Sequence, residues 1–424
     1  RTGRLLAPKM GMLTILLNAW RNGACEDMAF VPVYLGYDRV PEEGAYLHEA
    51  RGGDKAPESF KQLVKARKLL RARYGRIYVR FGQPLQLSDA LAEARAEAGL
   101  PKGPSGSDDR PLRSRDAAAL SARIAARTLC SINRHTVVTA QGLVAAALLS
   151  SPAQGLSLAA LNERVDLYLN YLLSQGVELA DTLMLDRRHA IDFVLNDFLR
   201  QKWVRRRYRG DAHTMTEARY RVRSGRRQML EYYKNGCLPV LLPAAVAGLA
   251  ILAHDAFQFT AEQLLPLMTE IEDRLAGEFP PDVDHPLNWR LRKALKAFMG
   301  EAILMPHPHL PDTYRLTAAG RRGLTRLAGL LKPLLDSYWI TVSAHLQAGA
   351  NNGSGKVSLS AKQIHQTGKR LFKAGRIDGI EALSLPIFQS AAAHYQLRLK
   401  GVDDPMTFFQ EEALGLERLL AHLS

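Results

Sequence analysis

The feature that most constrains the fold is an apolar run near the start of the chain, Phe30-Val-Pro-Val-Tyr-Leu-Gly-Tyr-Asp38. Such a run, interrupted by one proline, predicts a strand that is buried on both faces of a mixed sheet. Residues 39–59 follow with glycine, proline and charged residues but no hydrophobic period, as loops at strand ends do. A helical pattern over 60–73 then leads to a second strand pattern over 76–85. We therefore predict a βαβ-like unit.

The rest of the chain is predicted to be mostly helical, so the fold class is α+β. A Gly/Pro/Ser/Asp tract at 99–113 has the composition of a linker and separates residues 1–98, the α/β part, from a helical region at 114–424. A subdivision of this region is expected near residues 255 and 348. Apolar periodicity and capping signals predict helices at 5–22, 86–98, 116–133, 139–149, from 157 onward, 191–203, 261–275, 286–300, 336–347 and 386–398.

Two segments of the helical region need separate interpretation. Residues 237–253 carry no charge, but two prolines lie at the start of the segment and alanine is frequent, which favours a buried core helix over a membrane span or a shallow membrane-facing patch. The helices at 261–275 and 286–300 precede a predicted β-hairpin at 302–316. This order of elements is typical of a winged-helix-like module.

Several short segments near the N-terminus resemble one known family. Arg1-Thr-Gly-Arg4 is similar to the end of the phosphate-binding block Glu-Gly-Gly-Arg-Ser-Arg-Thr-Gly-Arg of bacterial glycerol-3-phosphate 1-O-acyltransferases. Val31-Pro-Val-Tyr-Leu-Gly-Tyr37 is similar to the next block of that family. The similarity continues through 44–59 and Tyr78-Val-Arg-Phe-Gly-Gln-Pro84, and more weakly to the C-terminus.

The resemblance implies that the chain is the C-terminal part of such an enzyme, beginning inside the phosphate-binding block. The enzyme would transfer a fatty acyl group from acyl-CoA or acyl carrier protein to the sn-1 hydroxyl of glycerol 3-phosphate, for phospholipid synthesis. The expected location is the cytoplasmic face of the bacterial inner membrane, as a peripheral protein in contact with an anionic lipid surface. No metal or prosthetic group is implied.

The same resemblance suggests substrate-binding residues. Guanidinium groups match phosphate oxygens in pairs, and amides at a helix N-terminus add positive potential. Without the resemblance, two arginines at a chain end are typical of a solvated terminus, and a proline in a strand is typical of an edge. The family match favours contacts with the substrate phosphate at the first block and pocket-lining roles at the second. The predicted residues are Arg1, Thr2, Gly3, Arg4, Pro32, Tyr34 and Tyr37.

No catalytic residue is predicted in this chain. In the family a His-x4-Asp motif upstream of the phosphate block supplies the general base and the carboxylate that orients it. The chain begins after that position, so we expect the chain alone to have no acyltransferase activity. His307-Pro-His-Leu-Pro-Asp312 has the same spacing, but it lies in a proline-rich turn and is interpreted as a solvated turn, neither catalytic nor metal-binding.

Charge leaves one alternative open. Lys and Arg number 57 and Asp and Glu 42, a net charge of +15 that favours phosphate-bearing partners. The densest basic segment, Arg200–Arg209, continues at 219–227 and is interpreted as a solvated helix face or a contact with anionic lipid headgroups. The competing hypothesis is a basic, helical nucleic-acid-binding protein with a winged-helix-like module. It explains residues 260–345 but not residues 1–85.

Overall fold

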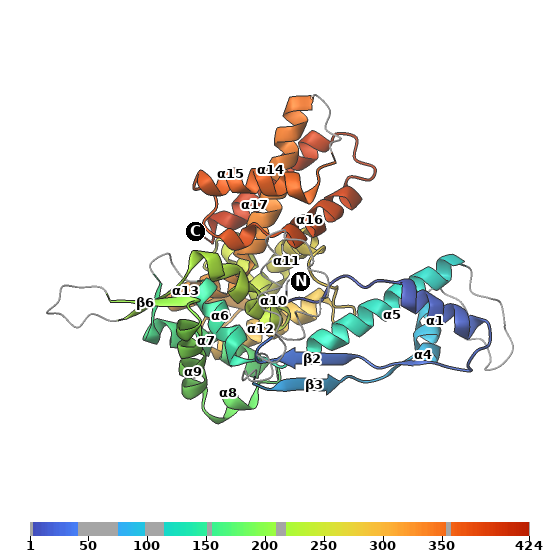
Figure 1. Cartoon of the computed structure of the whole chain (residues 1–424), viewed down its shortest axis with the longest axis horizontal. Helices are drawn as coiled ribbons and strands as arrows, with labels where there is room; N and C mark the ends of the chain where they lie inside the picture. The colour runs from blue at the N-terminus through green and yellow to red at the C-terminus, as the bar shows by residue number, and fades with distance from the viewer. Residues whose placement is uncertain are drawn as a thin grey trace, which may run out of the picture.

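The computed structural model describes residues 3–40, 75–97, 114–150, 155–208, 218–352 and 358–423. These residues form the predicted α+β fold, in which helices predominate and the strands form small antiparallel sheets. An arm projects from a larger helical body (Figure 1). The arm contains α1 (Gly11–Arg21), α4 (Leu87–Glu97) and most of α5 (Ser114–Arg134), which runs back into the body.

The arm has its own small core. Leu17 of α1, Leu87 and Ala90 of α4, and Leu120 and Ile124 of α5 form one buried cluster. Thus the first helix after the predicted linker packs against the elements that precede the linker. The linker itself lies outside the described residues, as do the predicted loop from 41 onward and the helix at 60–73, so the domain division stays a prediction.

Helix α1 is shorter than the sequence predicts, because it begins at Gly11 instead of residue 5. Pro8 explains the difference, since a proline disfavours helical conformation in the residue before it and removes an amide donor.

The predicted βαβ-like unit with a strand buried on both faces is wrong for the described residues. β2 (Val33–Tyr37) pairs with β3 (Ile77–Phe81) in an antiparallel two-stranded ribbon, whereas a βαβ unit would make them parallel. β1 (Ala29–Phe30) likewise pairs antiparallel with β4 (Leu85–Gln86). One face of the β2–β3 ribbon packs through Tyr34 and Tyr78 on Val137 and Ala180.

The opposite face of the β2–β3 ribbon is apolar and uncovered by any described residue. The register places Leu35 across from Val79 and Val33 across from Phe81, so their side chains share this face. Leu35 is 56% exposed and Phe81 71% exposed. The apolar pattern that predicted burial is therefore present, but its cover is not among the described residues.

Helix α10 (Arg227–His254) forms the centre of the body. It runs through Pro239 and Pro243 and packs against α6 (Ala140–Leu149), α11 (Ala261–Leu275) and α13 (Ala318–Ala328). By length and composition it could cross a membrane, yet 67% of its apolar window is buried inside the protein. The prediction of a core helix is confirmed, because a helix that is apolar all round needs burial on all sides.

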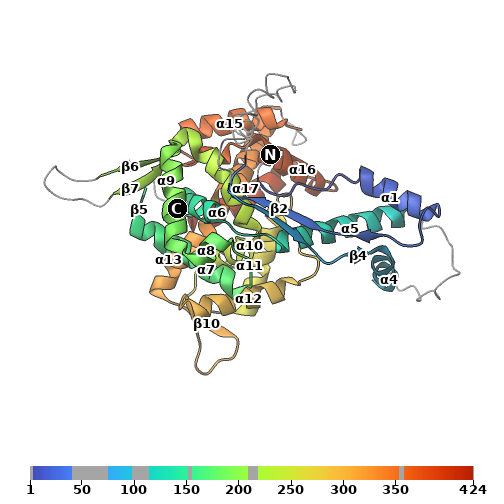
Figure 2. The same cartoon turned by 60° about the horizontal axis from the view of Figure 1, so that its bottom comes forward.

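The body contains two winged-helix-like modules in succession (Figure 2). The predicted module is β8 (Gln258–Thr260), α11, α12 (Leu287–Gly300), β9 (Leu304–Pro306) and β10 (Thr313–Leu316), with sheet order β8-β10-β9. A second one precedes it: β5 (Leu156–Ser157), α7 (Leu158–Ser174), α8 (Asp181–Leu185), α9 (Arg187–Arg200), β6 (Val204–Arg207) and β7 (Arg219–Val222), with order β5-β7-β6.

The two modules share local details as well as topology. Ser157 and Thr260 each cap the first helix through the side-chain oxygen. Lys202 and Ala302, each two residues past the end of the last helix of its module, both have positive φ, 59° and 52°. The arginine-rich segment was interpreted as a solvated helix face or a lipid contact, and the helix-face interpretation is wrong for the arginines that lie in β6 and β7.

The C-terminal helices complete the body above α10 in Figure 1. They are α14 (Lys332–Asn352), α15 (Ala361–Lys373), α16 (Leu385–Arg398) and α17 (Pro405–Ala421), with single 3-10 turns at Ser224–Arg226, Gly329–Leu331 and Ile380–Ala382. Helix α14 packs against α15, α16 and α17.

Candidate functional site

A cavity of about 430 Å³ lies where the N-terminal segment, β2 and α10 meet. Four of the predicted site residues line it: Gly3, Arg4, Tyr34 and Tyr37. The end of α5, the loop after it, the start of α6 and the first half of α10 supply the remaining wall, with Asn133, Thr136, Thr139, Tyr233 and Asn235 among the polar residues. Segments far apart in the sequence therefore meet at the N-terminal block that contains the predicted phosphate-binding residues.

Gly3 positions the N-terminal segment against α10. Its φ is +82°, a conformation that side-chain-bearing residues rarely adopt, and a Cβ there would overlap with the backbone carbonyl of Tyr232. Only glycine allows the chain to pass this close to the helix. The adjacent Arg4 is thereby directed into the body.

Arg4 is buried and held by the C-terminal helical region. Its Nη2 lies 2.6 Å from Oε2 of Glu278, and the side chains of the two residues are 5% and 2% exposed. Tyr338 of α14 donates a hydrogen bond to the other oxygen of the same carboxylate, at 3.2 Å. The guanidinium also lies over the ring of Phe279, 5.4 Å from its centroid.

The rest of the Arg4 guanidinium is available for a ligand. Its Nε and Nη1 are buried and have no hydrogen-bond partner among the described residues. Unpaired buried donors are costly, and native proteins retain them chiefly where a ligand or ordered water satisfies them. Burial also raises the pKa of Glu278, although the neighbouring Arg4 opposes this shift.

The other predicted residues lie in the cavity wall, outside the cavity, or outside the described part of the chain. Tyr34 donates a hydrogen bond to the carbonyl of Val137 at 3.3 Å, and burial raises its pKa to about 12, so it is a neutral phenol in the cavity wall. Tyr37 lines the cavity with its side chain 41% exposed. Pro32 is buried outside the cavity and packs near Gly82. Arg1 and Thr2 lie outside the described residues.

The described cavity wall offers binding groups but no activated nucleophile. Cys237 lines it, yet burial raises the pKa of its thiol to about 12, which keeps it protonated. Thr139 uses its side chain to cap α6. The sequence did not indicate Asn133, Thr136, Tyr233 or the Arg4 partners Glu278 and Tyr338, because single polar residues outside a motif carry no local signal.

The His307–Asp312 segment is a structural turn, as predicted. Nδ1 of His307 accepts hydrogen bonds from the amides of His309 and Leu310, while the Asp312 carboxylate pairs with both terminal nitrogens of Arg292. Neither residue lines the cavity.

One cluster in the described part of the chain has metal-ligand character: Cys130, Asp282 and Asp284. The guanidinium of Arg134 pairs with Asp284 and donates to the Cys130 sulfur. An arginine thus already neutralises this cluster, and we assign it a structural role.

Comparison with known proteins identifies relatives. A family model described as the C-terminal region of glycerol-3-phosphate acyltransferase matches residues 46–398. The glycerol-3-phosphate acyltransferase of Actinobacillus succinogenes is 30% identical over 376 residues, which cover 86% of this chain and 43% of the relative. That of Pseudomonas putida W619 is 29% identical over 403 residues, 92% of this chain and 44% of the relative. That of Pseudomonas fluorescens Pf-5 is 28% identical over 432 residues, 98% of this chain and 48% of the relative. The chain therefore spans less than half the length of these relatives.

Proposed function

The chain belongs to the family of glycerol-3-phosphate acyltransferase C-terminal regions, and from this membership we propose that its N-terminal cavity binds the phosphate of glycerol 3-phosphate. One observation carries the proposal: Arg4 lines the cavity, and two nitrogens of its buried guanidinium have no hydrogen-bond partner among the described residues. Charge-assisted hydrogen bonds from arginine to phosphate are strong and geometrically specific. Gly3 and the neutral Tyr34 shape the remaining wall.

The reaction we propose for the whole protein is acyl transfer. The sn-1 hydroxyl of glycerol 3-phosphate attacks the thioester of acyl-CoA or acyl carrier protein, the thiol leaves, and a general base takes the hydroxyl proton. A thioester is already activated, so the chemistry needs no metal or prosthetic group. The described cavity wall holds no histidine or carboxylate that could serve as the base. A His-x4-Asp motif outside this chain would supply it, and the chain alone would be inactive.

The uncovered face of the β2–β3 ribbon supports the proposal that the catalytic base comes from outside this chain. It presents Val33, Leu35, Val79 and Phe81 on a strand pair whose other face is packed. Exposed apolar surface of this kind marks an interface. We infer that the remainder of the acyltransferase domain covers it and brings the catalytic motif to the cavity.

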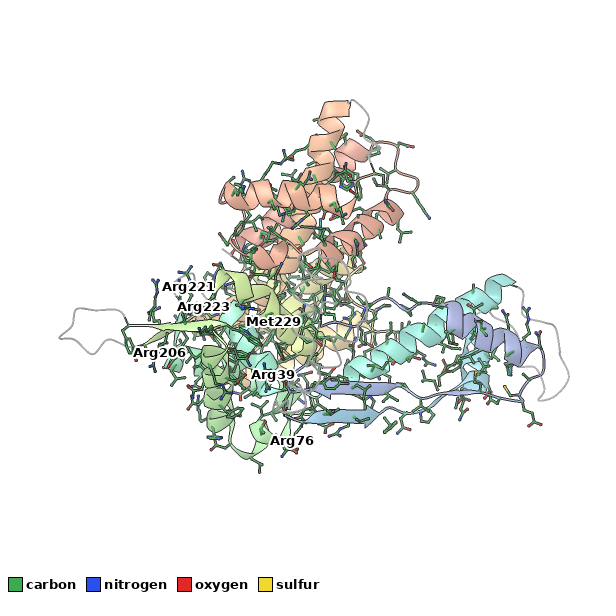
Figure 3. All side chains as sticks on the ribbon, viewed as in Figure 1. Arg39, Arg76, Arg206, Arg221, Arg223 and Met229 are labelled. Atoms are coloured by element: carbon green, nitrogen blue, oxygen red, sulfur yellow. The ribbon has the colours of Figure 1, made fainter. Side chains whose placement is uncertain are left out.

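We also propose peripheral contact with an anionic membrane, through the β6–β7 ribbon at the cytoplasmic face of the inner membrane. The ladder places Arg205 directly opposite Arg221 and Arg207 opposite Arg219. Figure 3 shows Arg221 and Arg223 on one side of the ribbon and Arg206 on the other. No ion pair joins these arginines to a carboxylate of the described chain. Anionic headgroups would relieve the repulsion between them.

A chimera tests the catalytic proposal. The N-terminal part of the Actinobacillus succinogenes relative is joined to this chain and assayed with labelled glycerol 3-phosphate and an acyl thioester, either CoA or carrier protein. We expect an acylated, solvent-extractable product carrying the acyl group at sn-1, and none from this chain alone. The intact relative, assayed in parallel, controls for the conditions. A folded chimera without activity, or activity in this chain alone, would contradict the proposal.

A further inference from the structure

A second cavity, of about 610 Å³, lies behind the first and has a different character. Its wall comes from α10, the end of α11, the loop after α11 and the start of α12, together with the ends of α5 and α7 and the residues that follow α7. Apolar side chains predominate. Those used below are Pro239, Val240, Leu242, Val246, Ala276 and Phe279. This volume and composition are typical of a site for a small, mostly apolar ligand.

The two cavities adjoin. Asn133 and Pro239 line both of them. Phe279, which lines the apolar cavity, also lies beneath the guanidinium of Arg4 at 5.4 Å. Arg4 thus lies at the junction, because it lines the polar cavity and its guanidinium stacks on a ring that lines the apolar cavity. The pair of cavities matches a molecule with a phosphate at one end and a hydrocarbon chain at the other.

The apolar wall of this cavity includes a part of α10 that is less buried than the rest of the helix. Most of α10 is fully buried, but Val240, Leu242 and Pro243 are only partly covered and face this cavity. Pro243 cannot donate a backbone hydrogen bond, and such prolines mark places where a helix interior departs from regular pairing. The opening therefore coincides with an irregular stretch of the central helix.

The rim of the cavity is amphipathic. His285 stacks on Trp289 with ring centroids 4.1 Å apart, and Nζ of Lys293 lies 4.9 Å from the Trp289 ring centroid. Lys293 has no carboxylate partner among the described residues; its one hydrogen bond, at 3.5 Å, goes to the carbonyl of Gln175. Among the other charged residues of the rim, Asp273 forms no ion pair within the described part of the chain. The rest are in ion pairs, as Arg290 is with Glu272. Tryptophan and lysine at the mouth suit a chain that enters from an interface.

We propose that this second cavity binds the fatty acyl chain of the acyl-glycerol phosphate formed in the adjoining cavity. The inference rests on the proposed function, because it assigns the acyl group of the same reaction. It gives the helical region a direct role in substrate recognition: α10, α11 and α12 hold the tail, while Arg4 holds the head.

Direct binding to this chain tests the inference without any need for catalysis. The probe is cis-parinaric acid, a fluorescent fatty acid that accepts energy from tryptophan. Trp289 is the tryptophan that lines the cavity. We expect saturable binding with quenching of tryptophan emission, and loss of that quenching, but not of binding, in Trp289→Phe.

Two variants locate the bound tail, and one serves as a control. Val240→Asp puts a charge in the apolar wall, and Ala276→Phe fills the cavity from an exposed position that folding tolerates. Each is expected to weaken parinarate binding about tenfold or more. Leu173→Asp makes the same kind of change on an exposed position of α7 outside the cavity and should have no effect. Equal affinities in the folded variants and the parent chain would overturn the inference.

The chimera separates this inference from the function on which it rests. The chimera that carries Ala276→Phe could still acylate glycerol 3-phosphate with an unchanged preference for long acyl chains. This result would overturn the acyl-chain assignment while the proposed function stands. Parinarate binding that responds to the cavity variants in a chimera without acylation would overturn the proposed function and leave a tail-binding site.

Discussion

Arg4 illustrates how much of the site depends on residues distant in sequence. Gly3 lets the backbone approach α10, Glu278 holds one side of the guanidinium, and Phe279 supports its face. Tyr338 in turn orients Glu278. The first block of the sequence identified Gly3 and Arg4 as candidates, whereas their partners nearly three hundred residues away carried no signal, because a buried glutamate can be recognised only from its contacts.

The Arg4–Glu278 pair should dominate local stability. Glu278→Ala leaves a buried guanidinium without its carboxylate, which typically costs about 3–5 kcal/mol of unfolding free energy. The double variant Arg4→Met/Glu278→Leu should recover most of that loss, because two apolar side chains need no mutual charge. Urea unfolding of the parent chain, of the single variants Glu278→Ala and Arg4→Met, and of the double variant measures these free energies. A loss below about 1 kcal/mol, as for an exposed pair, would contradict the burial described.

Asp336 of α14 should give stability a distinct pH dependence. Burial raises its pKa from 3.8 to about 6, although the nearby Lys332 opposes the shift; Asp378 and Glu381 add to it. Between those values the folded state retains a proton that the unfolded state has lost, so stability falls as pH rises from about 4 to about 6, by roughly 3 kcal/mol for this residue.

Asp336→Asn should remove that part of the pH dependence, and the exposed Asp378→Asn should alter it far less. Urea unfolding at a series of pH values provides the comparison. Parallel curves for the parent chain and Asp336→Asn would show that Asp336 titrates normally.

At the scale of elements, local sequence signals worked where they involve neighbouring residues. The capping signals in the sequence correspond to two capping boxes, Thr260 with Gln263 and Ser360 with Gln363, and α11 has the predicted bounds. Strand pairing depends on distant partners, so the direction of β3 relative to β2 was not predictable from its apolar pattern. The hairpin β6–β7 was missed because a run of arginines has no alternating pattern of polar and apolar residues.

The β6–β7 ribbon should be strained by its own charge. Arg221→Glu replaces a like-charge pair with Arg205 by an opposite-charge pair and should raise the midpoint of unfolding. Arg223→Glu makes the same change of charge beyond the paired register and should stabilise less, because Arg223 acts on Arg205 without being its ladder partner. Both variants should bind less to phosphatidylglycerol vesicles in co-sedimentation. A lower unfolding midpoint for Arg221→Glu would contradict the cross-strand repulsion, and unchanged vesicle binding would contradict the membrane contact.

At the scale of the whole molecule, the family assignment expected from residues 1–85 is confirmed by relatives that match most of the chain. The sequence also indicated correctly that a basic helical region with a winged-helix-like hairpin follows. It did not reveal that this module has a predecessor, since the two share topology and helix-end geometry more than residues. The burial of Arg4 against Glu278 joins the N-terminal segment to this helical region.

The uncovered face of the β2–β3 ribbon should make this chain bind hydrophobic dyes. Phe81→Lys removes a large exposed side chain from that face and should lower the fluorescence of bound anilinonaphthalene sulfonate with little loss of stability. Leu185→Lys, at an exposed position on α8 outside that face, serves as the matched control. In the chimera the same face should be covered, so the dye signal should fall and Phe81→Lys should become destabilising. Equal dye binding by this chain and the chimera would argue against the interface.

The central claim is that Arg4 holds the substrate phosphate, and the most direct measurement is the KM for glycerol 3-phosphate of the chimera and its Arg4→Met variant. Loss of charge-assisted hydrogen bonds worth about 1.5–3 kcal/mol should raise this KM by roughly ten- to a hundredfold, with the KM for the acyl donor unchanged. The double variant Arg4→Met/Glu278→Gln leaves neither charge of the pair and should raise the KM for glycerol 3-phosphate as Arg4→Met does. Arg292→Met, which removes an exposed ion pair, should have the same KM as the parent chimera. An unchanged KM for glycerol 3-phosphate in the folded Arg4 variants would contradict the account.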